Sequence, residues 1–357
     1  MIGGGIAGVT AALALAESGR SVQIAEKERD IGGHGVKLCC KATDVCRQCG
    51  ACVVADKMAR VRTHPAIAIL TGAKLSGLCR QASGFEASLA RVDHREETVL
   101  DVRAVVAATG FTPFDAKRKP QFGYGTCADV VTGLDLEEQI RLTGSIARRS
   151  DGRRPKTMAF VQCVGSRDVH IGNDYCSRVC CKYALRMASL LQSRLSGLDV
   201  TVFYMDIRME GKGSQEFYET CRKSMRFVRA IPAKIRQKNS GAVGVEYEDA
   251  VQGRLVGELF DMVVLSNGMA PGPDTASLAA ILGIGVNGSG FFEHRHVTET
   301  NETSVEDIFL AGTCQGPKDI EGSMAHAQAA AARTVLFLAG SQGINAAAAK
   351  RNAEKAL

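Results

Sequence analysis

Four cysteines gather in the middle of the chain at a spacing that suits a metal cluster. Cys163 is followed by Cys176, Cys180 and Cys181, so four thiols fall within nineteen residues and two of them are adjacent. Four thiolates are the ligand set of an iron–sulfur cluster. Single buried free cysteines are common, but four so close together are hard to obtain by accident. The segment therefore predicts a metal site made by these four residues.

The residues around these cysteines indicate how a fold would hold them. Residues 157–161 (TMAFV) form an apolar run typical of a buried strand, so Cys163 is expected at a strand end. After the cysteines, apolar side chains recur with the period of a helix at Tyr183, Met187, Leu190, Leu191 and Leu195. Cys180 and Cys181 would then lie at or near a helix start, where the helix dipole favours an anionic group such as a thiolate-bound cluster.

A glycine pattern near the N-terminus predicts a dinucleotide site. Gly3, Gly5 and Gly8 spell G-x-G-x-x-G, an alanine-rich helical run follows, and a strand at residues 21–25 (SVQIA) leads to Glu26. In this arrangement the first glycine allows a tight turn, the second lets the backbone approach a pyrophosphate, and the third lets the helix pack on the strand. The helix N-terminus would face the phosphates, and Glu26 would bind a ribose hydroxyl.

Two features qualify this interpretation. Only Met1 and Ile2 precede the motif, so either translation starts upstream or the first strand is abnormally short. A second G-x-G-x-x-G occurs at Gly283, Gly285 and Gly288, but a short helical run precedes it and no helical run follows. We interpret this second pattern as a glycine-rich turn rather than a phosphate-binding loop.

Two later stretches favour a flavin over a nicotinamide at the first site. Both are buried-strand runs that end in small residues: AVVAA at 104–108 leads into Thr109 and Gly110, and IFLA at 308–311 leads into Gly312 and Thr313. Flavoproteins with two dinucleotide domains use an A-T-G stretch and a late strand ending in A-G-D in this way. Thr313 stands where that Asp is expected, so the ribityl contact would come from a hydroxyl or the backbone. A helix at 323–338 begins with small residues that permit close approach to a flavin ring.

Composition excludes several classes of function. The net charge of +6 is mild and scattered, and aromatic residues make up only 5% of the chain, so nucleic-acid binding is not expected. No window of 18 apolar residues predicts a membrane span. Thirteen cysteines without a secretion signal point to metal or redox chemistry in a reducing compartment, and we expect a cytoplasmic protein.

A second group of cysteines leaves three interpretations open. Cys39, Cys40, Cys46, Cys49 and Cys52 lie in LCCKATDVCRQCGAC, which contains part of a bacterial ferredoxin run but lacks its x3-C-P continuation. The group could hold a second cluster, form a redox dithiol near the flavin, or serve as a surface loop that docks a partner. The isolated cysteines are expected to be packed thiols: Cys79, Cys127, Cys221 and Cys314.

Together these motifs resemble the A-type subunits of heterodisulfide reductases and their relatives. The stretches that carry the match are GGGIAG at 3–8, CGACVVADKMARVRTHP at 49–65, QCVGSRD at 162–168, YCSRVCCKYA at 175–184, YMDIRMEGKGSQEFY at 204–218 and LAGTCQGPKDI at 310–320. The resemblance spans nearly the whole chain, and the cysteine spacing is particular to that family.

The resemblance implies an α/β fold with two Rossmann-like, thioredoxin-reductase-like domains. The first, at 1–120 and 290–357, would bind FAD. The second, at 121–289, would carry a [4Fe-4S] cluster on Cys163, Cys176, Cys180 and Cys181. That cluster would occupy the place where related proteins bind NAD(P)H, so nicotinamide binding is expected to be lost.

The resemblance also implies partners and a setting. Methanogen-type versions carry an N-terminal extension and inserted ferredoxin domains, and no C-x2-C-x2-C-x3-C-P occurs in this sequence. The chain resembles the short form of sulfur-oxidising heterodisulfide-reductase-like complexes, with B- and C-type partner subunits and a homodimeric state. A similar short form in quinone-interacting complexes of sulfate reducers is an alternative. Fewer clusters mean fewer electron exits, so we do not expect flavin-based bifurcation.

The expected FAD contacts combine the motifs above with flanking residues. They are Gly3, Gly5, Gly8, Glu26, Lys27, Gly33, Ala108, Thr109, Gly110, Gly312, Thr313, Lys318, Asp319 and Ile320. Lys318 is also the candidate catalytic residue, because a cation near flavin N5 or N1 would tune its potential. Lys182, beside the cluster cysteines, is better interpreted as a surface lysine, and His326 as a packed residue.

The function that these expectations describe is an electron relay, in which FAD passes electrons to the cluster. Two other functions are alternatives to it. One is a stand-alone FAD enzyme that moves electrons between a thiol or persulfide and NAD(P)H through a dithiol in residues 39–52. The other is a docking scaffold whose cofactors are vestigial. Reduction of the flavin by NADPH would support the first, and absence of reducible cofactor would support the second.

Overall fold

The computed structural model describes residues 1–92 and 97–354, with side chains up to residue 340, and divides into two compact units. The first unit comprises Met1–Val36, Cys52–Phe111 and Pro271–Leu357, and the second comprises Lys37–Ala51 and Thr112–Ala270. These boundaries differ from the expected ones at about 120 and 290. Residues 37–51, which we call the cysteine loop, belong to the second unit, although the segments on both sides of them in the sequence belong to the first. Within the described residues, no helix combines the length and apolar composition needed to cross a bilayer.

The first unit is built on a parallel sheet whose central strand is a stub. The strands are β1 (Val22–Glu26), β2 (Ile67–Thr71), β6 (Val105–Ala107) and β17 (Ile308–Leu310). β1 pairs with β2 and β6 pairs with β17, while Ile2 bridges Ala25 on one side and Ala107 on the other. Ile2 therefore joins the two pairs of strands into one sheet as a single bridging residue.

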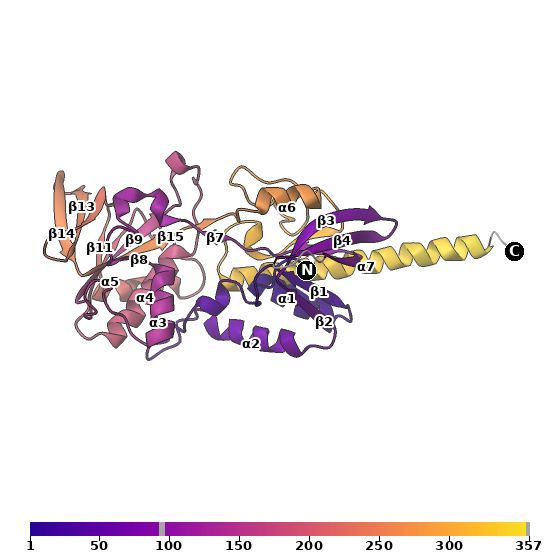
Figure 1. Cartoon of the computed structure of the whole chain (residues 1–357), viewed down its shortest axis with the longest axis horizontal. Helices are drawn as coiled ribbons and strands as arrows, with labels where there is room; N and C mark the ends of the chain where they lie inside the picture. Colours follow the sequence, from indigo (N-terminus) through magenta and orange to yellow (C-terminus); the bar gives the residue numbers. More distant parts are fainter. Residues whose placement is uncertain (93–96, 355–357) are drawn as a thin grey trace. The chain divides into compact units, whose positions relative to one another are not determined.

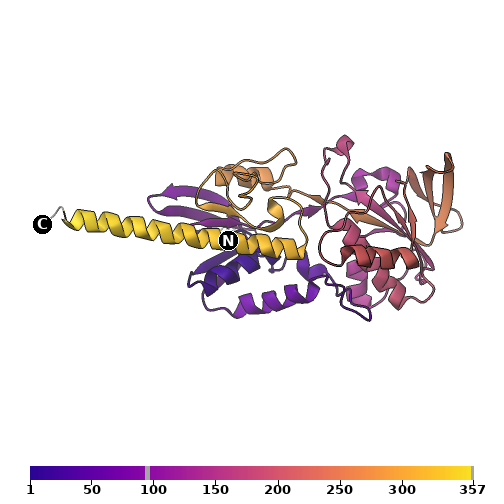
Figure 2. The same ribbon diagram turned by 180° about the vertical axis from the view of Figure 1, so that it is seen from behind.

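Both faces of this sheet are covered. One face packs against α1 (Ile6–Glu17), α2 (Ala51–Thr63) and the first part of α7 (Ile320–Glu354), which Figure 2 shows in yellow along the unit. The other face packs against the antiparallel strands β3 (Ala73–Gln81), β4 (Gly84–Arg91) and β5 (Glu97–Val102), and against α6 (Thr275–Leu282). Val106 faces the helices and Val105 faces the antiparallel strands, as alternation along a doubly buried strand requires.

The second unit repeats the plan with five parallel strands in the order β11-β10-β9-β15-β8. These are β8 (Val130–Thr132), β9 (Thr157–Val164), β10 (Asp199–Phe203), β11 (Arg226–Val228) and β15 (Met262–Asn267). Helices α3 (Gly133–Thr143), α4 (Cys180–Arg194) and α5 (Ser214–Ser224) cover one face (Figure 1). Strands β12 (Lys234–Gln237), β13 (Val243–Asp249) and β14 (Arg254–Phe260) cover the other, and the short pair β7 (Thr112–Pro113) and β16 (Met269–Ala270) lies where the chain enters and leaves.

The predicted elements that should position the chemistry are present. The helix after the glycine motif, the strand before Cys163 and the helix that begins at the paired cysteines all form. The second glycine pattern is a turn, as expected: Gly283 ends α6 in a left-handed conformation, and no α-helix follows among the described residues before α7. α7 continues through the alanine-rich end of the chain as far as Glu354, and the remaining three residues lie outside the described part of the chain.

Candidate functional site

In the glycine loop of the first unit, two of the three motif glycines have no space for a side chain, and the other borders open space where a ligand could approach. A Cβ atom on Gly8 would lie 2.0 Å from the carbonyl oxygen of Gly3, and one on Gly3 would lie 2.5 Å from that of Ala108. By contrast, a Cβ on Gly5 would meet no described atom within 4 Å. The first and third glycines therefore permit close backbone packing, and the second leaves a bare surface at the start of α1, which fits a pyrophosphate.

Glu26 lies beside this loop at the end of β1. Its carboxylate is buried and accepts hydrogen bonds from the backbone N–H of Gly4 at 2.7 Å and of Glu28 at 2.9 Å. Gly33 is also at the loop, since a Cβ there would lie 3.3 Å from the Cα of Gly5. Lys27 forms a half-exposed ion pair with Asp274 at 3.1 Å. The structure thus brings Glu26 and Gly33 to the glycine motif.

The two later strands bring their small residues to the same end of the sheet. A Cβ on Gly110 would lie 4.0 Å from the hydroxyl of Thr313, and one on Gly312 would lie 2.4 Å from the Cβ of Ala7 in α1. Gly312 has a φ of 75°, a conformation that favours glycine. Ala108 contacts Gly3, and Thr109 follows it. The ATG and AGT stretches therefore converge on the glycine loop, although they are about 200 residues apart.

His326 fixes the turn at Gly312. Its Nδ1 accepts a hydrogen bond from the Gly312 backbone N–H at 2.9 Å, and its Nε2 lies 3.2 Å from the Thr300 hydroxyl. Burial, with a smaller contribution from the charge of Lys318, lowers the pKa of His326 to about 4. The imidazole is therefore neutral, with Nδ1 as acceptor and Nε2–H as donor. The sequence suggested only a packed residue.

The start of α7 supplies a cation and a helix N-terminus to the same region. Lys318 donates to the Gln315 side chain at 2.5 Å and to the Gly316 carbonyl at 3.3 Å, and its charge acts on Cys314 and His326. Asp319 accepts from the Gly322 backbone N–H at 2.8 Å, and α7 begins at Ile320. A helix N-terminus and an ammonium group together favour negative charge, as on a reduced flavin ring.

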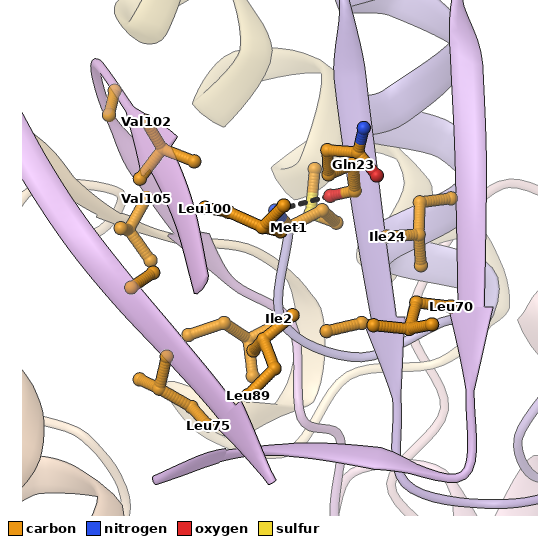
Figure 3. A pocket seen from close by; sticks show the side chains of 13 residues that line it. Met1, Ile2, Gln23, Ile24, Leu70, Leu75, Leu89, Leu100, Val102 and Val105 are labelled. Carbon is orange, nitrogen blue, oxygen red and sulfur yellow. Dashed lines mark hydrogen bonds between the residues drawn. The ribbon is translucent and has the colours of Figure 1, made fainter. Parts of the chain in front are cut away.

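A small apolar pocket in the first unit is not part of this arrangement. It measures about 40 Å³ and lies between the sheet and the strands β3 to β5 (Figure 3). The labelled side chains that point into it include Ile2, Leu75, Leu89 and Val105. Its described lining includes none of the expected cofactor contacts. We interpret it as a gap in the packing of the two layers.

In the second unit the four predicted cysteines lie in one region. Cys163 lies at the end of β9, and the buried Cys180 and Cys181 are the first residues of α4. Burial raises the pKa of Cys163 to about 11, and the nearby thiols of Cys181 and Cys176 add to the shift. A hydrogen bond from Cys180 lowers the pKa of Cys181 to about 7, because Cys180 retains the proton. The four thiols therefore share one neighbourhood.

Backbone strain concentrates at this segment. Among the described residues, the non-glycine residues with positive φ are Gln48 (50°), Cys163 (60°), Arg167 (56°) and Arg178 (63°). Three of the four fall between Cys163 and Cys181, the range that we call the cluster segment. Such conformations cost free energy and persist where the surrounding structure requires them, often at functional sites.

N–H donors are directed at three of the thiols. The backbone N–H of Arg178 donates to Cys176 at 3.3 Å, and the backbone N–H of Arg208 donates to Cys181. The Arg167 side chain donates to Cys163 and is held by an ion pair with Asp206. Because a sulfur atom accepts strongly only when it carries negative charge, this set of donors suits thiolates.

Gln162 adds an unusual buried polar group. Its side chain is 1% exposed, and within the described part of the chain neither end of its carboxamide has a hydrogen-bond partner. It follows Met158 and Phe160 at alternate positions on β9, and both of these pack against α4. The amide is therefore on the side of the sheet where α4 begins, next to Cys163 in the chain. Buried amides without partners are costly, and an iron–sulfur cluster would supply an acceptor.

The donor set fits a cluster in chemistry, but the thiols are not drawn together as they would be around a metal. Within the described residues, no group of three cysteine, histidine or carboxylate side chains has an arrangement that could hold a metal ion. The sequence indicated the four cysteines but missed Gln162, Arg167, Asp206 and Arg208. All four of these lie in stretches that carried the family resemblance, which is the signal that could have found them.

The segment after β9 differs from a dinucleotide-binding loop. After β9 the chain enters the cluster segment, and α4 does not begin until Cys180. Gly165 is the glycine nearest the strand end, and a Cβ there would lie 2.0 Å from the ring of Phe114. No α-helix begins directly at the turn after β9, in a segment that the structure describes in full, so the turn lacks the helix N-terminus that would face a pyrophosphate.

Comparison with protein families matches residues 1–334 to the pyridine nucleotide-disulphide oxidoreductase family. Among curated proteins, the chain is 32% identical to an A-type iron–sulfur subunit of the CoB–CoM heterodisulfide reductase of Methanopyrus kandleri, covering 95% of this chain and 64% of that protein. It is 30% identical to the A-type subunit of the H(2):CoB-CoM heterodisulfide,ferredoxin reductase of Methanothermobacter marburgensis, covering 94% and 63%. The chain thus spans a little under two thirds of these relatives.

Solved structures support the fold. The thioredoxin reductase of Lactococcus lactis superposes with a TM-score of 0.62 at 17% identity, covering 95% of this chain and 98% of that one. The thioredoxin reductase of T. acidophilum superposes with a TM-score of 0.59 at 18% identity, and the match covers 93% of this chain and 95% of that one. The expected pair of thioredoxin-reductase-like α/β domains is therefore confirmed.

Proposed function

Since this chain belongs to the pyridine nucleotide-disulphide oxidoreductase family and is related to the A-type subunits of heterodisulfide reductases, we propose that it is a flavin-dependent electron-transfer subunit with FAD in the first unit and a [4Fe-4S] cluster in the second. The observation that carries this proposal is that four cysteines lie at and after the end of β9, at the position where a nicotinamide would bind in such a fold.

The residues of the first unit would bind and orient FAD. Gly3, Gly5 and Gly8 with the start of α1 would hold the pyrophosphate, and Glu26 would receive a ribose hydroxyl. Thr109, Gly110, Gly312 and Thr313 would border the ribityl chain and ring, with His326 holding the turn at Gly312. Lys318 and the N-terminus of α7 would stabilise negative charge on the ring.

The residues of the second unit would hold the cluster. Cys163, Cys176, Cys180 and Cys181 would be its ligands, and the N–H groups of Arg178 and Arg208 would stabilise the thiolates. FAD supplies exchange of electrons in pairs or singly, and an iron–sulfur cluster supplies exchange of single electrons. The pair of sites therefore suits conversion between two-electron and one-electron chemistry.

The finer proposal is a place in a heterodisulfide-reductase-like complex. The resemblance of its motifs to those of sulfur-oxidising heterodisulfide-reductase-like complexes supports a role in dissimilatory sulfur oxidation, with B- and C-type partner subunits and a homodimeric state for this chain. The alternative is the corresponding A-type chain of a quinone-interacting complex of sulfate reducers. All thirteen cysteines are free thiols, which supports a reducing compartment, and we propose the cytoplasm.

The test is the cofactor content of anaerobically purified protein. We would measure iron, acid-labile sulfide and FAD per chain in the wild type, in Cys180→Ala and in Cys79→Ala, a control at an exposed cysteine of β3. The proposal expects one FAD throughout and the loss of about four iron atoms in Cys180→Ala alone. Bound FAD with no iron lost in Cys180→Ala would refute it.

A second candidate is a stand-alone thiol or persulfide:NAD(P)H oxidoreductase, which the family match by itself favours. The packing of Phe114 at Gly165 counts against nicotinamide binding. Stopped-flow mixing with NADPH separates the two functions. Rapid bleaching of the flavin would favour the second candidate, and a slow reaction at high NADPH concentration would favour the electron-transfer role.

A further inference from the structure

Lys318 carries its charge at the end of a flexible side chain that two neutral groups hold. A lysine ammonium is a point charge on a four-carbon stem, so it stays at one position only where acceptors fix it. Lys318 donates to the Gln315 side-chain oxygen at 2.5 Å and to the Gly316 carbonyl at 3.3 Å. Because both acceptors are neutral, they fix the ammonium without cancelling its charge. The neighbouring carboxylate of Asp319 accepts the Gly322 backbone N–H at the start of α7.

The ammonium determines which way the Gln315 amide faces. An ammonium cannot accept a hydrogen bond, so the amide must present its oxygen to Lys318 and its NH2 group to the other side. On that side the amide nitrogen lies 3.1 Å from Nδ1 of His294. Because an amide NH2 group can only donate, Nδ1 must accept, and the ring proton is then on Nε2. The three side chains therefore form one hydrogen-bonded series, in which Lys318 donates to Gln315 and Gln315 donates to His294.

His294 is the fixed end of this series, because the backbone around it is held. The Phe292 N–H donates to the Cys314 carbonyl at 3.0 Å, which joins the segment of the histidine to the residue that precedes the glutamine. On the other side, the Arg295 N–H donates to the Glu302 carbonyl at 2.8 Å. The Phe292 side chain is fully buried. The histidine thus gives the amide a fixed partner, and the amide in turn gives the lysine one.

The Lys318 ammonium lies near the turns that would border the flavin. Its charge acts on the buried Cys314 thiol and on His326, which holds the glycine turn after β17. The same thiol donates to the Ala107 carbonyl at the end of β6 at 3.2 Å and to the Ala311 carbonyl after β17 at 3.3 Å. A positive charge at this place would stabilise negative charge on a reduced flavin ring. Moving the ammonium away would therefore change the potential of the ring.

We propose that Gln315 and His294 are positioning residues, which hold the Lys318 ammonium beside the flavin and so raise the midpoint potential of the flavin. Loss of either hydrogen bond frees the ammonium to move into solvent, where salt and water screen its charge. The reduced flavin then loses stabilisation, and its potential falls. The effect on the flavin rests on the proposed function, whereas the hydrogen-bonded series is a property of the protein alone.

The first test measures the midpoint potential of bound FAD in the full chain by redox titration followed by absorbance. Lys318→Met should make the potential more negative, and Gln315→Leu and His294→Phe should shift it in the same direction by a smaller amount. His294→Asn should keep the wild-type value, because asparagine Oδ1 takes the place of Nδ1 as acceptor. His296→Phe is the matched control, since this histidine is exposed and its Nδ1 bonds to Thr298. It should leave the potential unchanged.

The double variant Lys318→Met/Gln315→Leu shows whether the glutamine acts through the lysine. Its potential should equal that of Lys318→Met, since no ammonium is left to position. A shift caused by Gln315→Leu that is equally large with and without the ammonium would overturn the inference. An unchanged potential in Gln315→Leu, where Lys318→Met has shifted, would overturn it as well and leave the proposed function in place. An unchanged potential in Lys318→Met would refute the inference and the role of that lysine together.

A second measurement needs no FAD. Reductive methylation followed by mass spectrometry compares how fast each lysine reacts, and an amine held in hydrogen bonds reacts slowly. In FAD-free protein, Lys318 should react several-fold faster in Gln315→Leu and His294→Phe than in the wild type, His294→Asn and His296→Phe. Lys27, which pairs with Asp274, is the internal reference.

This measurement separates the inference from the proposed function. Failure of the protein to bind FAD would refute the proposed function, and faster reaction of Lys318 in the two variants would still support its positioning by Gln315 and His294. Equal rates at Lys318 in all forms would overturn the inference whether or not FAD binds.

Discussion

The Lys41 ammonium and the Glu137 carboxylate form an ion pair from which solvent is almost excluded, with side-chain exposures of 2% and 1%. Lys41 also donates to the Cys39 carbonyl at 2.7 Å, and the Tyr183 hydroxyl donates to Glu137 and to the Gly133 carbonyl at 2.9 Å. The pair ties the cysteine loop to α3 and α4. A buried charge of this kind is tolerable only while its partner and hydrogen bonds are in place.

Removing one member of this pair should therefore release the loop. Lys41→Met leaves the Glu137 carboxylate buried without its counter-charge, which we expect to cost about 3–5 kcal/mol of local stability. Hydrogen exchange of residues 38–50 should rise strongly in this variant. The double variant Lys41→Met/Glu137→Gln removes both charges and should recover much of the protection. Equal exchange in the single variant and the wild type would show that the pair does not anchor the loop.

The glycine loop offers a sharp test of the FAD site, because the sequence contains a matched control. Gly8→Ala would place a Cβ 2.0 Å from a backbone oxygen, so the loop must distort and FAD should be lost on purification. Gly5→Ala meets no described atom in the protein and should keep the fold while weakening FAD binding by about tenfold or more, about 1.4 kcal/mol. Gly288 is the third glycine of the second G-x-G-x-x-G pattern, and a Cβ there would meet no described atom within 4 Å. Gly288→Ala should therefore bind FAD as the wild type does. FAD retained in Gly8→Ala would contradict the assignment.

Elements set by local pattern could be predicted from the sequence. The G-x-G-x-x-G motif, the apolar run before Cys163 and the helical period after Cys181 each depend on neighbours in the chain, and each forms where expected. The convergence of Gly110 with Thr313 depends on sheet order, which the flavoprotein pattern implied. Local sequence pattern thus predicted the helices and strands, and the resemblance to two-domain flavoproteins predicted how they are arranged.

The cysteine loop could not be placed in this way. Its anchor joins Lys41 to a residue 96 positions away, and a lysine and a glutamate in polar stretches are ordinarily surface residues. The same limit applies to His326, which accepts a hydrogen bond from the Gly312 backbone N–H. It also applies to Gln162, whose buried amide has no hydrogen-bond partner among the described residues. Sequence pattern shows which side chains are apolar, but it does not show which polar ones are buried or what they face.

The neutral state of His326 predicts a dependence of stability on pH. Its pKa is about 4 in the folded protein against 6.5 ordinarily, so the unfolded chain binds the extra proton and stability falls as the pH drops below 6.5. The loss at pH 5 should be about 2 kcal/mol. His326→Gln keeps an acceptor for the Gly312 N–H but does not titrate. Thermal unfolding and FAD release at pH 7 and pH 5 should therefore show a smaller difference in the variant, and equal differences would refute the neutral histidine.

The amide of Gln162 should act differently with and without a cluster. In iron-free protein the group is buried and unpartnered among the described residues, so Gln162→Leu should leave stability unchanged or raise it. In iron-loaded protein the same change removes an N–H donor to the cluster, so the iron should stay while the midpoint potential becomes more negative. Gln192→Leu, at a glutamine near the far end of α4 that donates to the Ser224 carbonyl at 2.9 Å, is the control and should leave the potential unchanged. Redox titration followed by electron paramagnetic resonance measures the shift. An unchanged potential at full iron content would show that the amide does not reach the cluster.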